Sequence, residues 1–175
     1  MARRLIVIGR GLTAERVAAL AGPLGYDELR LSEEVVELLA DDHVVIAEDE
    51  PQAGRVTLLE AASGEVMPAY LGFAAPHREG WKALVWLAAR DVPKARIDAI
   101  SAPAGVDVGA ETPEEVAISV AAELVAIRRG RPRPSAGLEL AAGKRSRGVE
   151  ARPRRLLGSF GRAILPDDDE SGGRN

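Results

Sequence analysis

The sequence predicts an α/β fold: a doubly wound, mostly parallel, Rossmann-like sheet of about five strands with helices on both faces. Short apolar runs alternate with segments of helical periodicity, the first run ends in a glycine turn at Gly9, and the last helix has a complete start signal at Thr112. Strands that alternate with helices at short intervals pair in parallel through right-handed crossovers. A chain of 175 residues that is 46% hydrophobic can form one such core.

Local sequence signals predict each strand and helix. Residues 4–8 are a continuous apolar run, typical of a buried parallel strand and too short for a stable helix. Residues 12–24 carry apolar side chains at helical spacing, Ser32 with acidic residues behind it predicts a helix start, and Pro51 predicts another. The expected strands are residues 4–8, 26–31, 43–47, 68–72 and 96–101, and the expected helices are 12–24, 32–40, 51–62, 76–90 and 112–129.

The loop before the last helix carries the most specific local signal. Gly105 and Gly109 are followed by Thr112, whose hydroxyl can cap the helix, by Pro113 at the first helical position, and by Glu115, which can complete a capping box. This pattern indicates a turn that faces a ligand and leads into a buried helix. Asp107, between the two glycines, is either a ligand contact or a residue that stabilises its own turn.

Charge and composition divide the chain and exclude several functions. Residues 1–130 hold 13 Lys and Arg against 21 Asp and Glu, whereas residues 131–175 hold 10 against 6. We therefore expect a Rossmann-like domain over residues 1–130 that does not bind nucleic acid, and a flexible tail over residues 131–175, basic and then acidic. The absence of cysteine excludes disulfides and thiolate metal sites, and the short apolar runs predict a cytoplasmic protein with no membrane partner.

Gly9 to Ala14 has the form GxGxxA between a predicted strand and a predicted helix, which is the context of a dinucleotide-binding turn. Gly9 would form the tight turn and Gly11 would let a pyrophosphate approach, whereas a turn that binds nothing is equally consistent with the motif. The crevice is expected at the C-terminal ends of the first and fourth strands. Glu33 could hold a ribose hydroxyl or stabilise a helix start, Asp49 could face the ligand or cap a helix, and Gly72 could admit a cofactor or only end a strand.

The segment Ala102 to Glu123, together with Val7 to Gly11 and Tyr70 to Gly72, resembles the Rossmann-type C-terminal domain of the XdhC/CoxI family. The resemblance covers roughly residues 4–130. Members of that family assist delivery of the molybdenum cofactor to xanthine dehydrogenase-like and carbon monoxide dehydrogenase-like enzymes. It therefore implies an accessory protein rather than an enzyme. The implied partners are molybdenum hydroxylase subunits or a separate protein that carries the family's N-terminal domain, and an oligomer is also expected.

The chain departs from the family pattern at three places. Leu12 replaces a histidine after the second glycine, Glu48-Asp49 replaces His-Asp after the third strand, and Phe73-Ala74 replaces Ser-Arg after the fourth. Loss of that arginine removes a bidentate phosphate donor, so anion affinity should fall unless Arg10 or Arg78 substitutes.

Three functions follow, in order of preference. The first is an accessory protein for maturation of a molybdenum hydroxylase, with the molybdenum cofactor or NAD(P) as the candidate ligand. The second is an NAD(P)-binding oxidoreductase, and the third is a non-catalytic interaction module with an empty crevice. No catalytic or metal-ligating residue is predicted, and His43 and His77 lack partners at metal-ligand spacing. The candidate cofactor-binding residues are Gly9, Arg10, Gly11, Leu12, Glu33, Asp49, Gly72, Gly105, Asp107 and Gly109.

Overall fold

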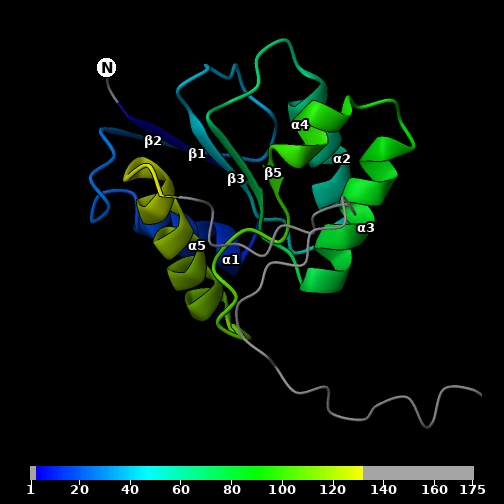
Figure 1. Cartoon of the computed structure of the whole chain (residues 1–175). Helices are drawn as coiled ribbons and strands as arrows, with labels where there is room; N and C mark the ends of the chain where they lie inside the picture. The colour runs from blue at the N-terminus through cyan, green and yellow to red at the C-terminus, as the bar shows by residue number, and fades with distance from the viewer. Residues whose placement is uncertain (1–2, 132–175) are drawn as a thin grey trace, which may run out of the picture. The chain divides into compact units, whose positions relative to one another are not determined.

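In the computed structural model, which describes residues 3–131, five parallel strands form one sheet in the order β2-β1-β3-β4-β5 (Figure 1). The α/β, Rossmann-like prediction is confirmed. The strands are β1 (Arg4–Ile8), β2 (Glu28–Ser32), β3 (His43–Ile46), β4 (Tyr70–Phe73) and β5 (Ile100–Ser101). The helices are α1 (Leu12–Ala19), α2 (Pro51–Ser63), α3 (His77–Ala88), α4 (Lys94–Asp98) and α5 (Pro113–Arg128). The predictions for the tail concern residues outside this range, apart from Arg131, and stay predictions.

Helices cover both faces of the sheet, as the alternation of buried side chains along the strands requires. On one face α1 and α5 pack over β1 and β3; on the other, α2, α3 and α4 pack over the same strands and β4 (Figure 1). The first core includes Leu5, Val7, Val17, Val45, Tyr70, Val120 and Leu124. The second includes Ile6, Ile8, Val44, Ile46, Leu58, Leu71, Phe73, Leu84, Leu87 and Ile97.

The helix predicted for residues 32–40 is wrong. β2 continues to Ser32, and the chain then reaches β3 through an irregular segment. The Ser32 hydroxyl donates to the carbonyl of Glu34 at 2.8 Å, and Asp42 accepts from the amide of Leu39 at 2.6 Å. Side-chain oxygens thus compete with helical hydrogen bonds, while Val35, Val36 and Leu38 still pack against the second core.

The strand predicted for residues 96–101 is mostly wrong, because the segment divides into α4 and the two-residue β5. Pro93 precedes the helix, where a missing amide hydrogen does no harm. Arg96 donates to the carbonyl oxygens of Ala62 at 2.8 Å and Gly64 at 2.5 Å, at the end of α2. A tertiary contact that the local pattern cannot show therefore decides the conformation of this segment.

The crevice is predicted at the C-terminal ends of the first and fourth strands, and the sheet order adds a third strand between them. β3 pairs with β1 on one side and with β4 on the other, so β1 and β4 are not neighbours. In the order 2-1-3-4-5, the strand order reverses between β1 and β3, which is where such sheets open a crevice. The loops after β1, β3, β4 and β5 all lie along that edge of the sheet (Figure 1).

A buried tyrosine–histidine pair lies at the opposite edge, at the start of β3. The Tyr26 hydroxyl and Nδ1 of His43 are 2.6 Å apart, and the His43 ring meets Tyr70 edge-on. Burial lowers the pKa of His43, and the charge of Arg128 lowers it further. Burial also raises the pKa of Tyr26 to about 12. Both shifts favour the neutral forms, an imidazole beside a phenol.

This pair predicts that the folded state loses stability as the pH falls below about 6.5, the ordinary histidine pKa. Below that pH the imidazole of His43 binds a proton in the unfolded chain but not in the folded state, where its pKa is lower. The free energy of unfolding should therefore fall by up to about 1.4 kcal/mol per pH unit. Urea unfolding of the wild type and His43→Gln between pH 7.5 and 5.5 measures the effect. We expect the slope to shrink in the variant, whereas an equal slope would assign the loss to other groups.

Candidate functional site

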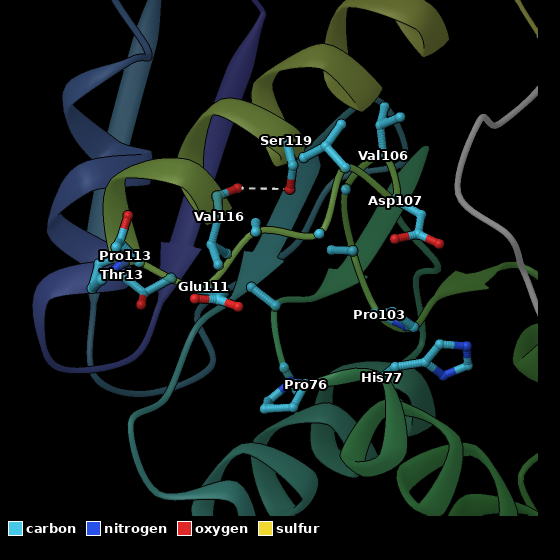
Figure 2. A pocket seen from close by; sticks show the side chains of 18 of the residues that line it. Thr13, Pro76, His77, Pro103, Val106, Asp107, Glu111, Pro113, Val116 and Ser119 are labelled. Carbon is cyan, nitrogen blue, oxygen red and sulfur yellow. Dashed lines mark hydrogen bonds between the residues drawn. The ribbon is translucent and has the colours of Figure 1, made fainter. Parts of the chain in front are cut away.

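A cavity of about 500 Å³ opens at the carboxyl edge of the sheet, and we call it the rim cavity (Figure 2). Its walls come from the loops after β3, β4 and β5 and from the first turns of α1, α3 and α5. This volume lies within the range of small-molecule sites. The lining residues are Thr13, Glu48, Asp49, residues 74–77, residues 103–113, Val116 and Ser119.

A buried carboxylate holds the loop that forms the longest wall. Glu123 of α5 is fully buried, and its Oε2 accepts from the amide of Gly105 at 2.5 Å and from the Tyr70 hydroxyl at 2.9 Å. Its Oε1 accepts from the Ser101 hydroxyl at 2.9 Å. Glu123 therefore joins β4, β5 and the loop in one network.

The ends of this loop are fixed as well. A Cβ added to Gly105, at φ +104°, would lie 2.3 Å from Oγ of Ser119, so only glycine fits there. Figure 2 shows Ser119 bonded to the Val116 carbonyl, at 2.9 Å. At the other end the predicted capping box is present, with Thr112 accepting from the amide of Glu115 at 3.2 Å. The Glu115 carboxylate accepts from the amides of Glu111 and Thr112, which lowers its pKa.

Between these fixed ends, residues 107–110 line the rim cavity, and their backbone amides are its candidate donors. Within residues 3–131, the amides of Asp107, Val108, Gly109 and Ala110 make no hydrogen bond to another protein group. The first-turn amides of His77 and Arg78 in α3 are likewise unbonded in that range, as expected at a helix start. Acidic side chains share the lining: Glu48, Asp49, Asp107 and Glu111. The cavity thus combines backbone donors with carboxylate acceptors and apolar proline and valine surface.

Carboxylates of the protein itself occupy the predicted anion-binding position at the glycine turn. The amide of Arg10 donates to Oε2 of Glu48 at 3.1 Å. A Cβ added to Gly11 would lie 1.9 Å from Oδ2 of Asp49, and one added to Gly9 would lie 2.2 Å from the Ala47 carbonyl oxygen. Contacts within the chain therefore account for both glycines. The residues present do not fit the pyrophosphate of NAD(P) at this turn.

The other predicted residues separate into two groups. Asp49, Gly105, Asp107 and Gly109 line the rim cavity, while Gly9, Arg10, Gly11 and Glu33 line a second hollow of about 420 Å³ beside the end of β2. In the second hollow Arg10 pairs with Glu33 at 2.5 Å, and both side chains are largely exposed, so this ion pair contributes little to stability.

Leu12 and Gly72 line neither hollow. Leu12 is 51% exposed at the start of α1. Gly72 lies inside β4, where a Cβ would meet the Tyr70 hydroxyl at 2.4 Å, so its missing side chain makes room for the tyrosine that binds Glu123.

Sequence reasoning missed Glu123, Glu48 and His77. Glu123 could have been found, because it falls on the same face of the predicted last helix as Val120 and Leu124 and is therefore a charged residue at a core position. Nothing in the sequence could indicate that Glu48 turns back to the amide of Arg10, since that contact depends on how the ends of β1 and β3 lie together.

Glu123→Gln tests the loop network. Glutamine keeps the volume but replaces one acceptor oxygen with an NH₂ that faces the donors of Gly105, Tyr70 or Ser101. We expect a loss of about 2 kcal/mol or more in the free energy of unfolding, measured by urea denaturation. Glu60→Gln, on the exposed side of α2, is the control and should stay within about 0.5 kcal/mol of the wild type. Equal, small effects in both variants would show that the network does not support the loop.

Among residues 3–131, no helix is both long and apolar enough to span a bilayer. That range also contains no cluster of three or more His, Asp or Glu side chains arranged to hold a metal ion.

Comparison with known proteins agrees with this fold. Over 158 residues the chain is 27% identical to YqeB, an uncharacterized protein of Escherichia coli strain K12, a match that covers 75% of this chain and 28% of YqeB. A crystal structure described as a xanthine dehydrogenase from Bacillus halodurans superposes with a TM-score of 0.58 at 22% identity, over 78% of this chain and 45% of that one. The chain thus spans under half the length of either relative. The family model of the XdhC Rossmann domain matches residues 5–124, and the chain belongs to that family.

Proposed function

We propose that this chain acts in the maturation of a molybdenum hydroxylase and that the rim cavity binds the molybdenum cofactor as cargo. The observation that carries the proposal is the loop of residues 102–112. It is the segment with the strongest family likeness, and in the structure Glu123 fixes it as the main wall of the cavity. Membership of the XdhC Rossmann family supports this role, and the Bacillus halodurans relative is described as an enzyme of the proposed client class.

The chemistry of the lining suits this cargo. The cofactor is a pyranopterin that carries a phosphate and a dithiolene-bound molybdenum. The amides of Asp107 to Ala110 and of the first turn of α3 would donate to the phosphate. Carboxylates such as Asp107 and Glu111 would accept from the N–H groups of the aminopyrimidine ring, and Pro76, Pro103 and Val106 offer apolar surface for its faces. A client enzyme and a companion domain would bind other surfaces of the protein.

A thermal-shift titration with purified molybdenum cofactor tests direct binding. A ligand at about 100 times its Kd stabilises the folded state by about 2.7 kcal/mol, which gives a clear rise in Tm. Ala110→Trp, which fills the cavity, should abolish the rise. Ala53→Trp adds the same bulk on the exposed side of α2, outside both hollows, and should preserve it.

The outcomes separate the alternatives. No shift with the cofactor in the wild type would exclude direct cofactor binding. A shift that survives in Ala110→Trp would place the cofactor elsewhere on the protein. Co-purification with the subunits of a molybdenum hydroxylase is tested in the same variants. Co-purification that persists in both tryptophan variants would favour an interaction module that does not carry cofactor.

A further inference from the structure

The glycine turn after β1 has the form of a dinucleotide site, and its own residues disagree with that ligand. We infer that Glu48 and Asp49 occupy the phosphate position of the turn and determine specificity by excluding nucleotide phosphates from it. The inference goes beyond the proposed function, because it concerns what the glycine turn excludes; Glu48 and Asp49 lie between this turn and the rim cavity, which they also line.

The space above the second glycine of the turn is already filled. In a dinucleotide site the second glycine leaves space for the pyrophosphate to approach the backbone, and free amides donate to it. Here the space over Gly11 holds the Asp49 carboxylate, with Oδ2, Cγ and Oδ1 at 1.9, 2.2 and 2.4 Å from the position of a Cβ. The amide of Arg10 is bonded to Glu48. One carboxylate therefore fills the space over the second glycine, and another takes the amide of Arg10.

The charges of Glu48 and Asp49 also oppose a phosphate at the turn. Glu48 and Asp49 are consecutive residues at the end of β3, so an incoming phosphate would meet two negative charges within a few ångströms. At 4 Å, two like charges repel by about 1 kcal/mol in water and by about 4 kcal/mol at the effective dielectric of a protein surface. The Arg10 guanidinium, the cation nearest in sequence, is paired with Glu33 at 2.5 Å and would have to leave that exposed pair to meet a phosphate.

The carboxylates also interact favourably with the start of α1 when no ligand is bound. α1 has no side-chain hydrogen bond at its N-cap, and Gly11 occupies that position. An acidic group beside the first turn of a helix is favoured by the helix dipole. Asp49, in the segment after β3, thus supplies the negative charge that a bound phosphate supplies in a dinucleotide site. A nucleotide phosphate at the turn would have to displace both side chains.

The experiment measures binding of ADP and NAD⁺ to the full-length wild type and to Glu48→Gln/Asp49→Asn by isothermal titration calorimetry. We expect the double variant to bind both at least about tenfold more tightly than the wild type. The control variant Glu50→Gln/Glu60→Gln removes two negative charges from exposed positions, one at the N-cap of α2 and one within the helix. Its affinity for ADP and NAD⁺ should match that of the wild type. Adenosine, which has no phosphate, should respond to neither pair of substitutions.

The two single variants, Glu48→Gln and Asp49→Asn, are measured as well, so the inference stays testable if the double variant fails to fold. An intermediate gain of ADP affinity in each would support it. ADP affinity that is unchanged in every variant, or tight in the wild type, would overturn it. An equal gain for adenosine, or for the Glu50/Glu60 control, would also overturn it, because the effect would then not come from a phosphate at the turn.

Discussion

One buried carboxylate organises the rim of this protein. Glu123 lies in the core face of α5 and accepts hydrogen bonds from β4, β5 and the loop between β5 and α5. A buried ionisable group is stable only when its lone pairs are satisfied, and here the donors are Tyr70 of β4 and, distant from it in sequence, Ser101 of β5 and Gly105 of the loop after it. Folding of the core therefore places the loop as well, and the loop in turn gives the rim cavity its shape.

The same rim shows how a familiar motif can serve the protein rather than a ligand. Gly9 accommodates the carbonyl of Ala47, and Gly11 accommodates the carboxylate of Asp49. The glycines thus let the ends of β1 and β3 approach closely, and the loop after β5 carries further amides that, within residues 3–131, make no hydrogen bond to another protein group.

Much of this architecture could be predicted from the sequence, because apolar runs, helix periodicity and capping residues are local signals. The five strands, the two helix layers and the capping box at Thr112 are of this kind. The helix expected at residues 32–40 failed because side-chain hydrogen bonds replaced helical ones, and the fifth strand was shortened by the contacts of Arg96 with α2. The partners of Glu48 and Glu123 depend on which loops the sheet order brings together, which no local pattern records.

The central claim is that a fixed loop presents free amides to a ligand, and hydrogen exchange of the loop amides tests it most directly. In the free protein, the amides of Gly105 and Val106 should exchange slowly, because they donate to Glu123 and to the Ser119 carbonyl. Those of Val108 to Ala110 should exchange fast and become protected when molybdenum cofactor is added. Fast exchange at Gly105, or no change at residues 108–110 with saturating cofactor, would contradict the account.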